Sequence, residues 1–398
     1  MPSDESDRRR RFPLGHATTE DQLVDDPHPA FDRLRRLEPI TWSPVVGGWL
    51  VTDRRLVITA LLDPASFTVD DARFSTGQVV GPSMLSLDGD QHRRHRSPFV
   101  APLRPTATRD RYSTAVGDAA NHIVSELRPR GRAELRTELA GPLAVTVITR
   151  ALGLVDTDDD DVLRWYRAIV SGVLDVSDGL PVGRAATDAV LSLRDRVVDT
   201  LGRRQPNSIL SAAVEQSDLS DDEVFSNVAV LMFGAIETSE AMMANALFHL
   251  LTHADQRARV AADRSLLDRA IDESLRLEPA AAVVDRYATG HLTFGPPDQE
   301  AEIRKGDLVR LSLAAANRDL AVFAEPHRFD INRPNADAHL AFVQGPHACI
   351  GAHLARLETR AAIEAVLDLL PGIEPGAGTA PAGLIFRKPD RLTARWPV

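Results

Sequence analysis

One ten-residue segment near the C-terminus, Phe342-Val-Gln-Gly-Pro-His-Ala-Cys-Ile-Gly351, contains the single cysteine of the chain, Cys349. Apolar residues recur behind it at positions 350, 354, 357, 363, 367 and 370 and predict a helix that starts near Cys349. A helix N-terminus lowers the pKa of a thiol because the dipole and the N–H groups favour the anion. Gly345 and Gly351 allow close approach of the backbone to a flat ring, and Phe342 shields the sulfur from water. The segment therefore predicts a thiolate ligand.

Two other interpretations of Cys349 remain open at this point. A cysteine outside a disulfide is often a small buried hydrophobic residue. His347, Cys349 and His353 could instead bind zinc. That arrangement would place three ligands on one short turn, however, and no second cluster completes a tetrahedron.

This segment resembles the haem-binding signature of the cytochrome P-450 family at every fixed position. The resemblance to the family extends over the chain from about residue 25 to the C-terminus. The resemblance implies haem b (iron protoporphyrin IX) as the cofactor and Cys349 as its proximal iron ligand. It also implies haem contacts from Phe342, Gly345, His347 and Gly351. Val343 and Ala348 depart from the glycine and the aromatic residue that many members carry.

Two upstream segments match the family in the required order. Glu273-Ser-Leu-Arg276 matches its Glu-x-x-Arg motif, and Pro326-His-Arg328-Phe329 matches its partner segment. A Glu/Arg pair three residues apart is usually a surface ion pair. The resemblance implies instead a buried network of Glu273, Arg276 and Arg328 that holds the cysteine loop.

Basic side chains are expected around the two haem carboxylates, which need charge-assisted donors when they are partly buried. His92 and Arg96 share one face of a helix because they lie four residues apart. The resemblance adds Arg286 and His347 to this set. Without the cysteine motif, the simplest interpretation of His92 and Arg96 would be a basic helix face exposed to solvent.

Glu237 and Thr238 lie in the apolar middle of a long predicted helix. A simple interpretation is that Thr238 bonds its own helix and that Glu237 reaches solvent. The resemblance implies that the pair activates oxygen, with Thr238 as donor and Glu237 as proton relay. The family's usual Ala-Gly is Gly234-Ala235 here, so opening the helix should cost up to about 1 kcal/mol more.

The elements that position these residues indicate a mainly α protein with a smaller β region (α+β). A Ser220-x-x-Glu223 capping box predicts the start of a helix of about thirty residues. A second, shorter helix is predicted at Leu266–Leu277. Strands are predicted at Ile40–Trp42, Gly48–Thr52, Val283–Ala288, His291–Phe294, Glu302–Ile303 and Leu308–Ser312. Ser66–Ser86 reads as a loop, and Asp156–Asp161 as a connection between helices. The resemblance implies the triangular cytochrome P-450 fold, with residues 1–24 flexible and 25–398 forming one domain.

The amino-acid composition argues against a nucleic-acid-binding protein and against a membrane-spanning one. Of 398 residues, 43% are hydrophobic, enough for a core around a bulky cofactor, and 5% are aromatic, few for stacking on bases. The net charge of −11 argues against a nucleic-acid surface. No apolar run is long enough to span a bilayer, and no secretory signal opens the chain. We therefore expect a cytoplasmic protein without a membrane anchor or nucleic-acid partner, and a monomer.

The expected function is that of a haem-thiolate monooxygenase of secondary metabolism, which inserts one atom of O2 into a hydrophobic small molecule such as a terpenoid, steroid, fatty acid or polyketide. The chain has no room for a flavin or iron–sulfur domain, so ferredoxin and ferredoxin reductase are the expected partners, docking near Arg93, Arg94, Arg104 and Arg356. Alternatives are a peroxide-driven enzyme, a coupling or isomerising enzyme of the same fold, and a non-enzymatic haem-ligand sensor. By alignment to the family, the substrate pocket should contain Met84, Leu85, Val230, Phe233, Gly234, Ala282, Val283 and Leu384.

Overall fold

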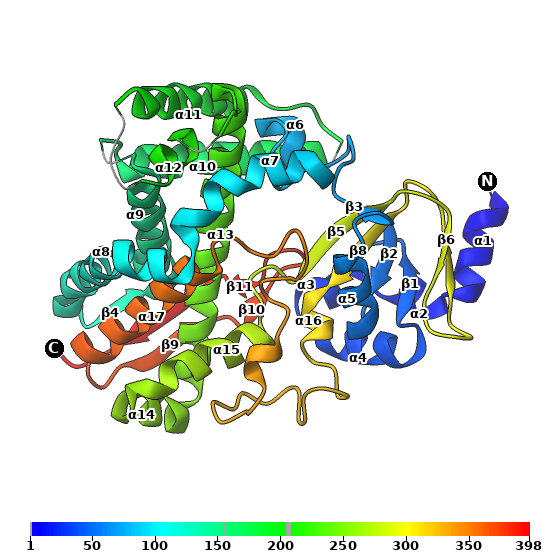
Figure 1. Cartoon of the computed structure of the whole chain (residues 1–398). Coiled ribbons are helices and arrows are strands. Elements are labelled where there is room, and N and C mark those ends of the chain that lie inside the picture. The colour runs from blue at the N-terminus through cyan, green and yellow to red at the C-terminus, as the bar shows by residue number, and fades with distance from the viewer. Residues whose placement is uncertain (1, 155, 178, 204–207, 216) are drawn as a thin grey trace. The chain divides into compact units, whose positions relative to one another are not determined.

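The computed structural model describes residues 2–154, 156–177, 179–203, 208–215 and 217–398. The chain divides into two compact units. Unit 1 contains Met1–Thr68, Ala244–Cys349 and Ala377–Leu392; unit 2 contains Val69–Met243, Ile350–Gly376 and Thr393–Val398. Helices predominate and the sheets are small, so the expected mainly α class with a smaller β region is confirmed (Figure 1).

Unit 1 is built around a five-stranded sheet. Its strands have the order β1 (Ile40–Ser43), β2 (Gly48–Val51), β8 (Leu308–Ser312), β5 (Val283–Ala288) and β3 (Phe67–Thr68). Only the β2–β8 pair within this sheet is parallel, with Leu50 opposite Arg310. The apolar side chains of β2 and β8 alternate with the pleat and pack with α5 (Arg54–Leu62) into one core.

Unit 1 contains further helices and short strands besides this sheet and α5. Its remaining helices and short strands are α1 (Pro2–Arg11), α2 (Pro13–Ala17), α3 (Glu20–Val24), α4 (His28–Leu37), α14 (Ala254–Ala262), η4 (Arg264–Leu266), α15 (Leu267–Leu277), α16 (Leu313–Ala316), η5 (Ala336–Ala338), β6 (Leu292–Phe294), β7 (Ala301–Ile303), β10 (Pro381–Ala382) and β11 (Lys388–Pro389). Phe12 and Leu23 are buried in the cores of this unit. The flexibility of residues 1–24 stays a prediction. The single domain over residues 25–398 also stays a prediction.

Unit 2 is mostly helical. Its elements are α6 (Ser75–Val80), α7 (Gly89–Val100), η1 (Ala101–Leu103), α8 (Pro105–Leu127), η2 (Arg128–Arg130), β4 (Arg132–Glu134), η3 (Arg136–Ala140), α9 (Gly141–Leu152), α10 (Asp159–Ser177), α11 (Arg184–Arg203), α12 (Ile209–Glu215) and α17 (Ala352–Leu369). Helix α17 packs against α8, and α10 packs against α11. A small sheet has the order β4, β12 (Leu392–Arg395) and β9 (Glu374–Gly378).

Helix α13 (Asp221–Thr252) has the predicted length and start. The Ser220 N–H donates to Glu223 and the Glu223 N–H donates to the Ser220 hydroxyl, at 2.8 and 3.3 Å, so the capping box is confirmed. The first part of the helix, up to Met243, belongs to unit 2 and the rest to unit 1. Most of residues 224–232 and all of residues 241–247 are buried, whereas the polar residues Glu237, Thr238 and Glu240 between them are partly exposed.

Two local predictions were wrong. Ser66–Ser86 is not a continuous loop, because it includes β3 and the helix α6. The glycine, serine and proline residues of this stretch indicated a loop, although tertiary packing stabilises the short elements β3 and α6. The acidic run is not only a connection either, since Asp159, Asp160 and Asp161 form the first turn of α10, where the helix dipole favours negative charge.

Candidate functional site

The cysteine loop of unit 1 is a tight turn that presents its thiol outward. The Cys349 N–H donates to the Phe342 carbonyl at 2.9 Å, and the Ala348 N–H donates to the Gly345 carbonyl at 3.1 Å. Cys349 itself is exposed. The interpretation of Cys349 as a buried hydrophobic residue is therefore wrong.

Two residues of this loop have positive φ angles, for which glycine is favoured. Gly345 has φ +78°, and a Cβ there would lie 2.6 Å from the carbonyl oxygen of Leu61 on α5. Glycine is required at this position for both reasons. Val343, which stands where many family members have glycine, has φ +51°. A β-branched residue in this region stores backbone strain of about 1–3 kcal/mol, so the surrounding bonds must hold the loop in place.

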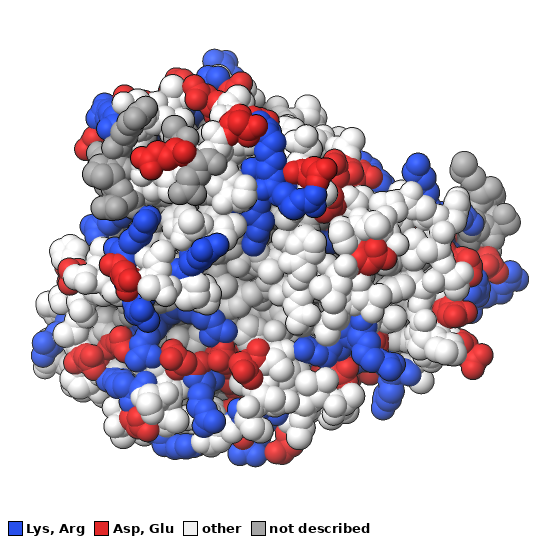
Figure 2. Space-filling view, viewed as in Figure 1, with Lys and Arg blue, Asp and Glu red and all other residues white. Residues whose placement is uncertain are grey.

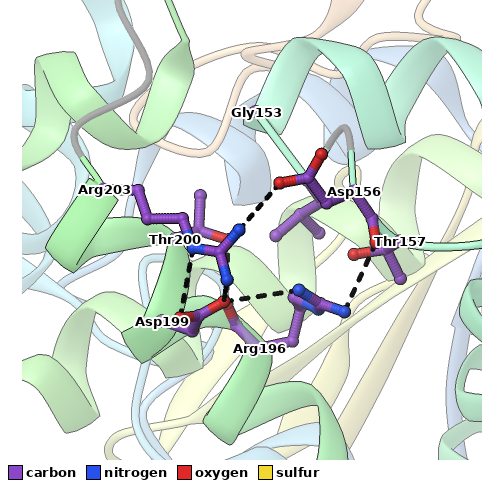
Figure 3. A pocket seen from close by; sticks show the side chains of 8 residues that line it. Gly153, Asp156, Thr157, Arg196, Asp199, Thr200 and Arg203 are labelled. Carbon is purple, nitrogen blue, oxygen red and sulfur yellow. Dashed lines mark hydrogen bonds and ion pairs between the residues drawn. The ribbon is translucent and has the colours of Figure 1, made fainter.

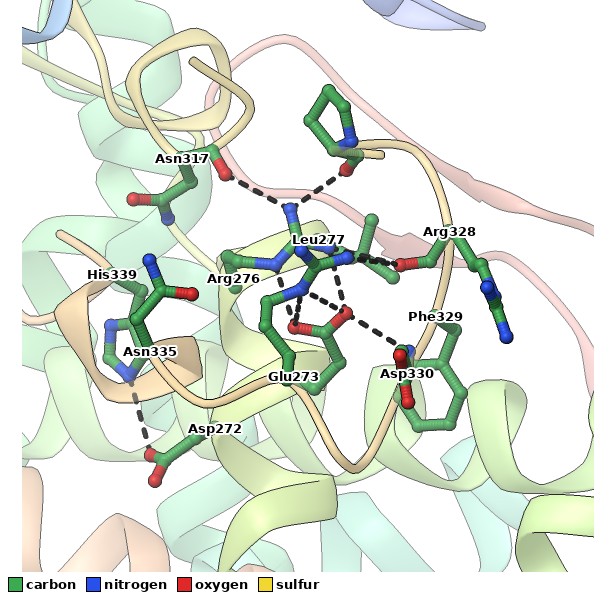
Figure 4. Close-up of polar contacts among 12 residues, drawn as sticks. Asp272, Glu273, Arg276, Leu277, Asn317, Arg328, Phe329, Asp330, Asn335 and His339 are labelled. Atoms are coloured by element: carbon green, nitrogen blue, oxygen red, sulfur yellow. Dashed lines mark hydrogen bonds and ion pairs between the residues drawn. The ribbon is translucent and has the colours of Figure 1, made fainter. Parts of the chain in front are cut away.

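Figure 4 shows a network of buried ionic contacts centred on Glu273 and Arg276 of α15. Glu273 and Arg276 are fully buried and form a two-pronged pair, with nitrogen–oxygen distances of 2.7 and 2.8 Å. Arg333 donates its Nε to both carboxylate oxygens of Glu273 at 2.9 and 3.0 Å. One carboxylate thus accepts from two guanidinium groups, which compensates the cost of burying it.

The second arginine of the network was assigned to the wrong residue. The side chain of Arg328 is 60% exposed and pairs with Glu325 at 3.2 Å, and only its backbone carbonyl takes part in the network, accepting from Arg276 at 3.1 Å. Arg333, five residues later, is buried and occupies the expected position. Glu325 has φ +46°, and its carbonyl accepts the Arg328 N–H at 3.1 Å in the turn that precedes Arg328.

Hydrogen bonds connect this network to the cysteine loop through Asn317. Arg276 donates to the Asn317 carbonyl at 3.1 Å, and the Asn317 side chain accepts the Leu340 N–H at 2.6 Å. The Leu340 carbonyl in turn accepts the Val343 N–H at 2.8 Å. The predicted role of the network in locking the loop therefore has a continuous physical path within unit 1.

The remaining expected haem and substrate contacts of unit 1 lie on β5 and on a neighbouring segment. Arg286 on β5 is buried, and its guanidinium donates to the Asp285 carbonyl at 2.7 Å. Ala282 and Val283 are buried at the start of the same strand, and the Ala282 N–H donates to the Ile385 carbonyl at 2.8 Å. The structure thus brings Ala282 next to the segment that carries Leu384. His347 is half-buried in the cysteine loop.

Helix α7 of unit 2 turns its predicted haem-contacting face inward. His92 is buried and Arg96 is half-buried, whereas Arg93 between them is exposed. The interpretation of this face as fully solvated is therefore wrong. His95 was missed by the sequence reasoning: its ring lies 3.0 Å from the Asn227 side chain and 3.4 Å from Glu223. Burial lowers the pKa of His95, so it is a neutral hydrogen-bonding group.

The acid and the alcohol on α13 are both bonded within unit 2. The Thr238 hydroxyl donates to the Gly234 carbonyl of its own helix, as the simpler interpretation predicted. The carboxylate of Glu237 accepts a hydrogen bond from the hydroxyl of Tyr166 on α10. Through Gly234 and Ala235 the helix is continuous. Sequence reasoning missed Tyr166, since nothing local relates two residues 71 positions apart.

The pocket residues expected in unit 2 lie on α13 and on the chain before α7. Met84 and Val230 are buried, and Leu85 and Phe233 are half-buried. The Met84 N–H donates to the side chain of Asn227 at 2.8 Å, which places Met84 against the turn of α13 that precedes Val230. A Cβ at Gly234 would meet no atom within 4 Å, so that side of α13 is open. The same is true of Gly351.

The donor set fits a haem group better than a metal ion bound by the protein alone. Among the described residues, no group of three or more His, Cys, Asp or Glu side chains is arranged to hold a metal, so the zinc interpretation finds no support. A single outward-facing thiol with neighbouring glycines suits an iron that has four other ligands of its own. Among the expected contacts, His92, Arg96, Arg286 and His347 are of the type that pairs with haem carboxylates.

One small pocket of unit 2 has no room for a ligand larger than water. The pocket formed by α11 and the turn after α9 is closed by ion pairs of Arg203 with Asp156 and Asp199 at 2.8 and 2.9 Å (Figure 3). Its volume of about 10 Å³ holds no more than a water molecule. Positive and negative side chains are interspersed on the face shown in Figure 2. Among the described residues, no helix is long and apolar enough to cross a membrane.

Comparisons with known proteins agree with one another. The family model described as Cytochrome P450 matches residues 185–370. The chain is 32% identical to cytochrome P450 monooxygenase PikC of Streptomyces venezuelae, over 93% of this chain and 91% of that protein. It is 31% identical to 20-oxo-5-O-mycaminosyltylactone 23-monooxygenase of Streptomyces fradiae, over 89% and 85%. The crystal structure of CalO2 superposes with a TM-score of 0.85 at 26% identity, covering 95% of this chain and 98% of that one.

Proposed function

The chain belongs to the cytochrome P450 family of haem-thiolate monooxygenases, and from this premise we propose that it inserts one atom of O2 into a hydrophobic small molecule by hydroxylation or epoxidation. The observation that carries the proposal is the cysteine loop, in which an outward-facing thiol sits on a turn held by the buried network of Glu273, Arg276 and Arg333.

Cytochromes P450 bind haem b, which supplies the iron at which dioxygen is activated. We assign Cys349 as the iron ligand, because a thiolate pushes electron density toward the metal. Phe342, Gly345 and Gly351 would lie against the ring. The carboxylates would be held by His92, Arg96, Arg286 and His347, whose charge-assisted bonds orient the group.

Glu237 and Thr238 are the proposed proton-handling residues. The Thr238 hydroxyl donates to the Gly234 carbonyl, and it would have to exchange that bond to donate to a water or to a ligand beside the helix. Glu237 would then pass protons from solvent to Thr238. Ala235 in the uninterrupted helix should make this exchange costlier than glycine would.

Electron supply through separate ferredoxin and reductase proteins remains part of the proposal. Two of the four arginines expected at the docking surface already have partners in unit 2: Arg93 pairs with Asp90, and Arg94 pairs with Glu223 at 2.6 Å. Exposed Arg104 is therefore the better candidate for attracting an acidic partner. The monomeric state and the cytoplasmic location stay predictions.

The substrate is proposed to be an apolar secondary metabolite of the terpenoid, steroid, fatty-acid or polyketide type. The support is the apolar character of the expected pocket residues, together with the relative named for its action on 20-oxo-5-O-mycaminosyltylactone. Those residues are Met84, Leu85, Val230, Phe233, Gly234, Ala282, Val283 and Leu384.

The test is product analysis with a panel of such compounds, supplied either with NADPH, ferredoxin and reductase or with hydrogen peroxide alone. The proposal predicts products one oxygen atom heavier in the first arm, with the label recovered from ¹⁸O2. Products in the peroxide arm alone would favour the peroxide-driven alternative. Coupled or rearranged products without added oxygen would favour the coupling or isomerising one, and binding of ligands without any product would favour a sensor.

A further inference from the structure

Tyr166 on α10 contacts two residues of α13 to which the proposed function gives different roles. Its hydroxyl donates to the carboxylate of Glu237, the proposed proton relay. Its ring lies 6.4 Å from that of Phe233, a proposed wall of the substrate pocket, at an interplanar angle of 40°. Phe233 and Glu237 are four residues apart and so share one face of α13. All three residues belong to unit 2.

The Tyr166 hydroxyl acts as a hydrogen-bond donor at any physiological pH. Burial raises the pKa of Tyr166 far above its usual value, and the negative charges of Glu237 and Glu240 raise it further, against a smaller opposite effect of Arg167. The hydroxyl therefore keeps its proton and holds the carboxylate by a strong neutral-to-anion hydrogen bond.

The acid and the alcohol are consequently both engaged in the structure. Glu237 accepts from Tyr166, and Thr238 donates to the carbonyl of Gly234. The bond from Tyr166 occupies Oε2 of Glu237, so a proton taken up at that oxygen must compete with the Tyr166 hydroxyl. This arrangement is a resting one, and proton delivery requires that the bond to Tyr166 loosen.

We propose that Tyr166 is a positioning residue that holds Glu237 at rest and releases it when a substrate occupies the space beside Phe233. The inference rests on the proposed function, because it needs Glu237 to be the proton relay. A molecule packed against Phe233 would shift the Tyr166 ring that lies next to it. Since the same ring carries the hydroxyl bonded to Glu237, its displacement would weaken that bond and free the carboxylate. Proton delivery would thus be suppressed while the pocket is empty.

The three tyrosines of the chain allow the bond to be observed directly. The haem-loaded protein is labelled with ¹³Cζ-tyrosine and studied by NMR in its diamagnetic reduced, carbon-monoxide-bound form. Tyr166→Phe assigns the signal of interest, and Tyr112→Phe removes another buried hydroxyl of unit 2 as a matched control. The Cζ signal of Tyr166 should move upfield in Glu237→Gln, because a neutral amide accepts a weaker hydrogen bond than a carboxylate.

Release is tested in the reduced protein with 4-phenylimidazole in place of carbon monoxide, because both compounds bind the iron, and both low-spin reduced forms are diamagnetic. Binding of 4-phenylimidazole is followed in the Soret band. The Tyr166 signal should move in the same direction as in Glu237→Gln, and Phe233→Ala should abolish this response. When the substrate-free holoenzyme is supplied with NADPH, ferredoxin and reductase, its reduction of O2 to hydrogen peroxide should rise several-fold in Tyr166→Phe but not in Tyr112→Phe.

A Tyr166 signal that is unchanged in Glu237→Gln, or unchanged on addition of 4-phenylimidazole, would overturn the inference, as would equal peroxide formation in both tyrosine variants. These results differ from a failure of the proposed function. That failure would appear as a wild-type holoenzyme that oxidises no compound with any electron source, even though its Tyr166 signal responds as expected.

Discussion

Replacement of Arg333 by alanine should destabilise the protein strongly, whereas the same replacement of Arg328 should be nearly neutral. Arg333 is buried and makes two bonds to the carboxylate of Glu273 and others to the carbonyls of Glu325 and Arg328, at 3.1 and 3.2 Å. Its loss leaves a fully buried carboxylate with Arg276 as its remaining charged partner in the network. The two arginines thus form a matched pair for one experiment.

The expected magnitudes differ clearly. Removing one partner of a buried ion pair costs about 3–5 kcal/mol. Glu273 keeps its two bonds to Arg276 and a bond from the Asp330 N–H, so we expect about 3 kcal/mol for Arg333→Ala, the lower end of that range. Arg328→Ala removes an exposed pair with Glu325 and should cost about 0–1 kcal/mol.

The assay is urea unfolding of purified holoprotein, followed by far-ultraviolet circular dichroism and by the Soret band. Because the network is linked through Asn317 to the cysteine loop, Arg333→Ala should also lose haem at a lower urea concentration than the wild type. Equal unfolding midpoints for the two variants, or a larger loss in Arg328→Ala, would show that the assignment of the network to Arg333 is incorrect.

The remaining predictions concern catalysis, the cysteine loop, pH and salt. Thr238→Ala should keep haem content but divert reducing equivalents to hydrogen peroxide with substrates that lack a hydroxyl near the iron, and Glu237→Gln should slow turnover by about 100-fold; coupled, full-rate oxidation by either variant would refute these roles. Gly345→Ala should weaken haem retention, because its φ of +78° costs a side chain about 1–3 kcal/mol, while Gly117→Ala on α8, with open space around its Cβ, should not. Burial raises the pKa of Glu358 to about 8, so the folded state binds its proton more tightly than the unfolded chain does. The free energy of unfolding should therefore fall by up to about 1.4 kcal/mol per pH unit from about pH 5 to pH 8, and Glu358→Gln should reduce this slope. Turnover limited by ferredoxin docking should fall as added salt shortens the Debye length below about 10 Å, and salt-independent rates would contradict an electrostatic docking surface.

Features encoded by neighbouring residues could be predicted from the sequence. The capping box at Ser220 and the extent of α13 follow from local hydrogen bonding and apolar composition. The bounds of β5 and β8 follow from turn residues such as Gly306 on either side of β-branched runs. The cysteine signature was also visible, because its ten residues are contiguous and two backbone hydrogen bonds, from Ala348 to Gly345 and from Cys349 to Phe342, close the turn within them.

Features decided by tertiary packing could not be predicted. Arg328 and Arg333 are both arginines near the expected position, and which of them is buried depends on contacts with distant residues such as Glu273. The bond of Tyr166 to Glu237 joins two helices far apart in the chain, and neither residue carries a local signal for it.

The absorption spectrum of the reduced protein with carbon monoxide tests the central claim, ligation of haem iron by Cys349, most directly. We predict that the purified protein contains haem b and shows the strongly red-shifted Soret band of a thiolate ligand. Cys349→Ser should lose that band. A wild-type protein that binds haem with the Soret band of a histidine ligand, or that purifies without haem and with stoichiometric zinc, would contradict the account.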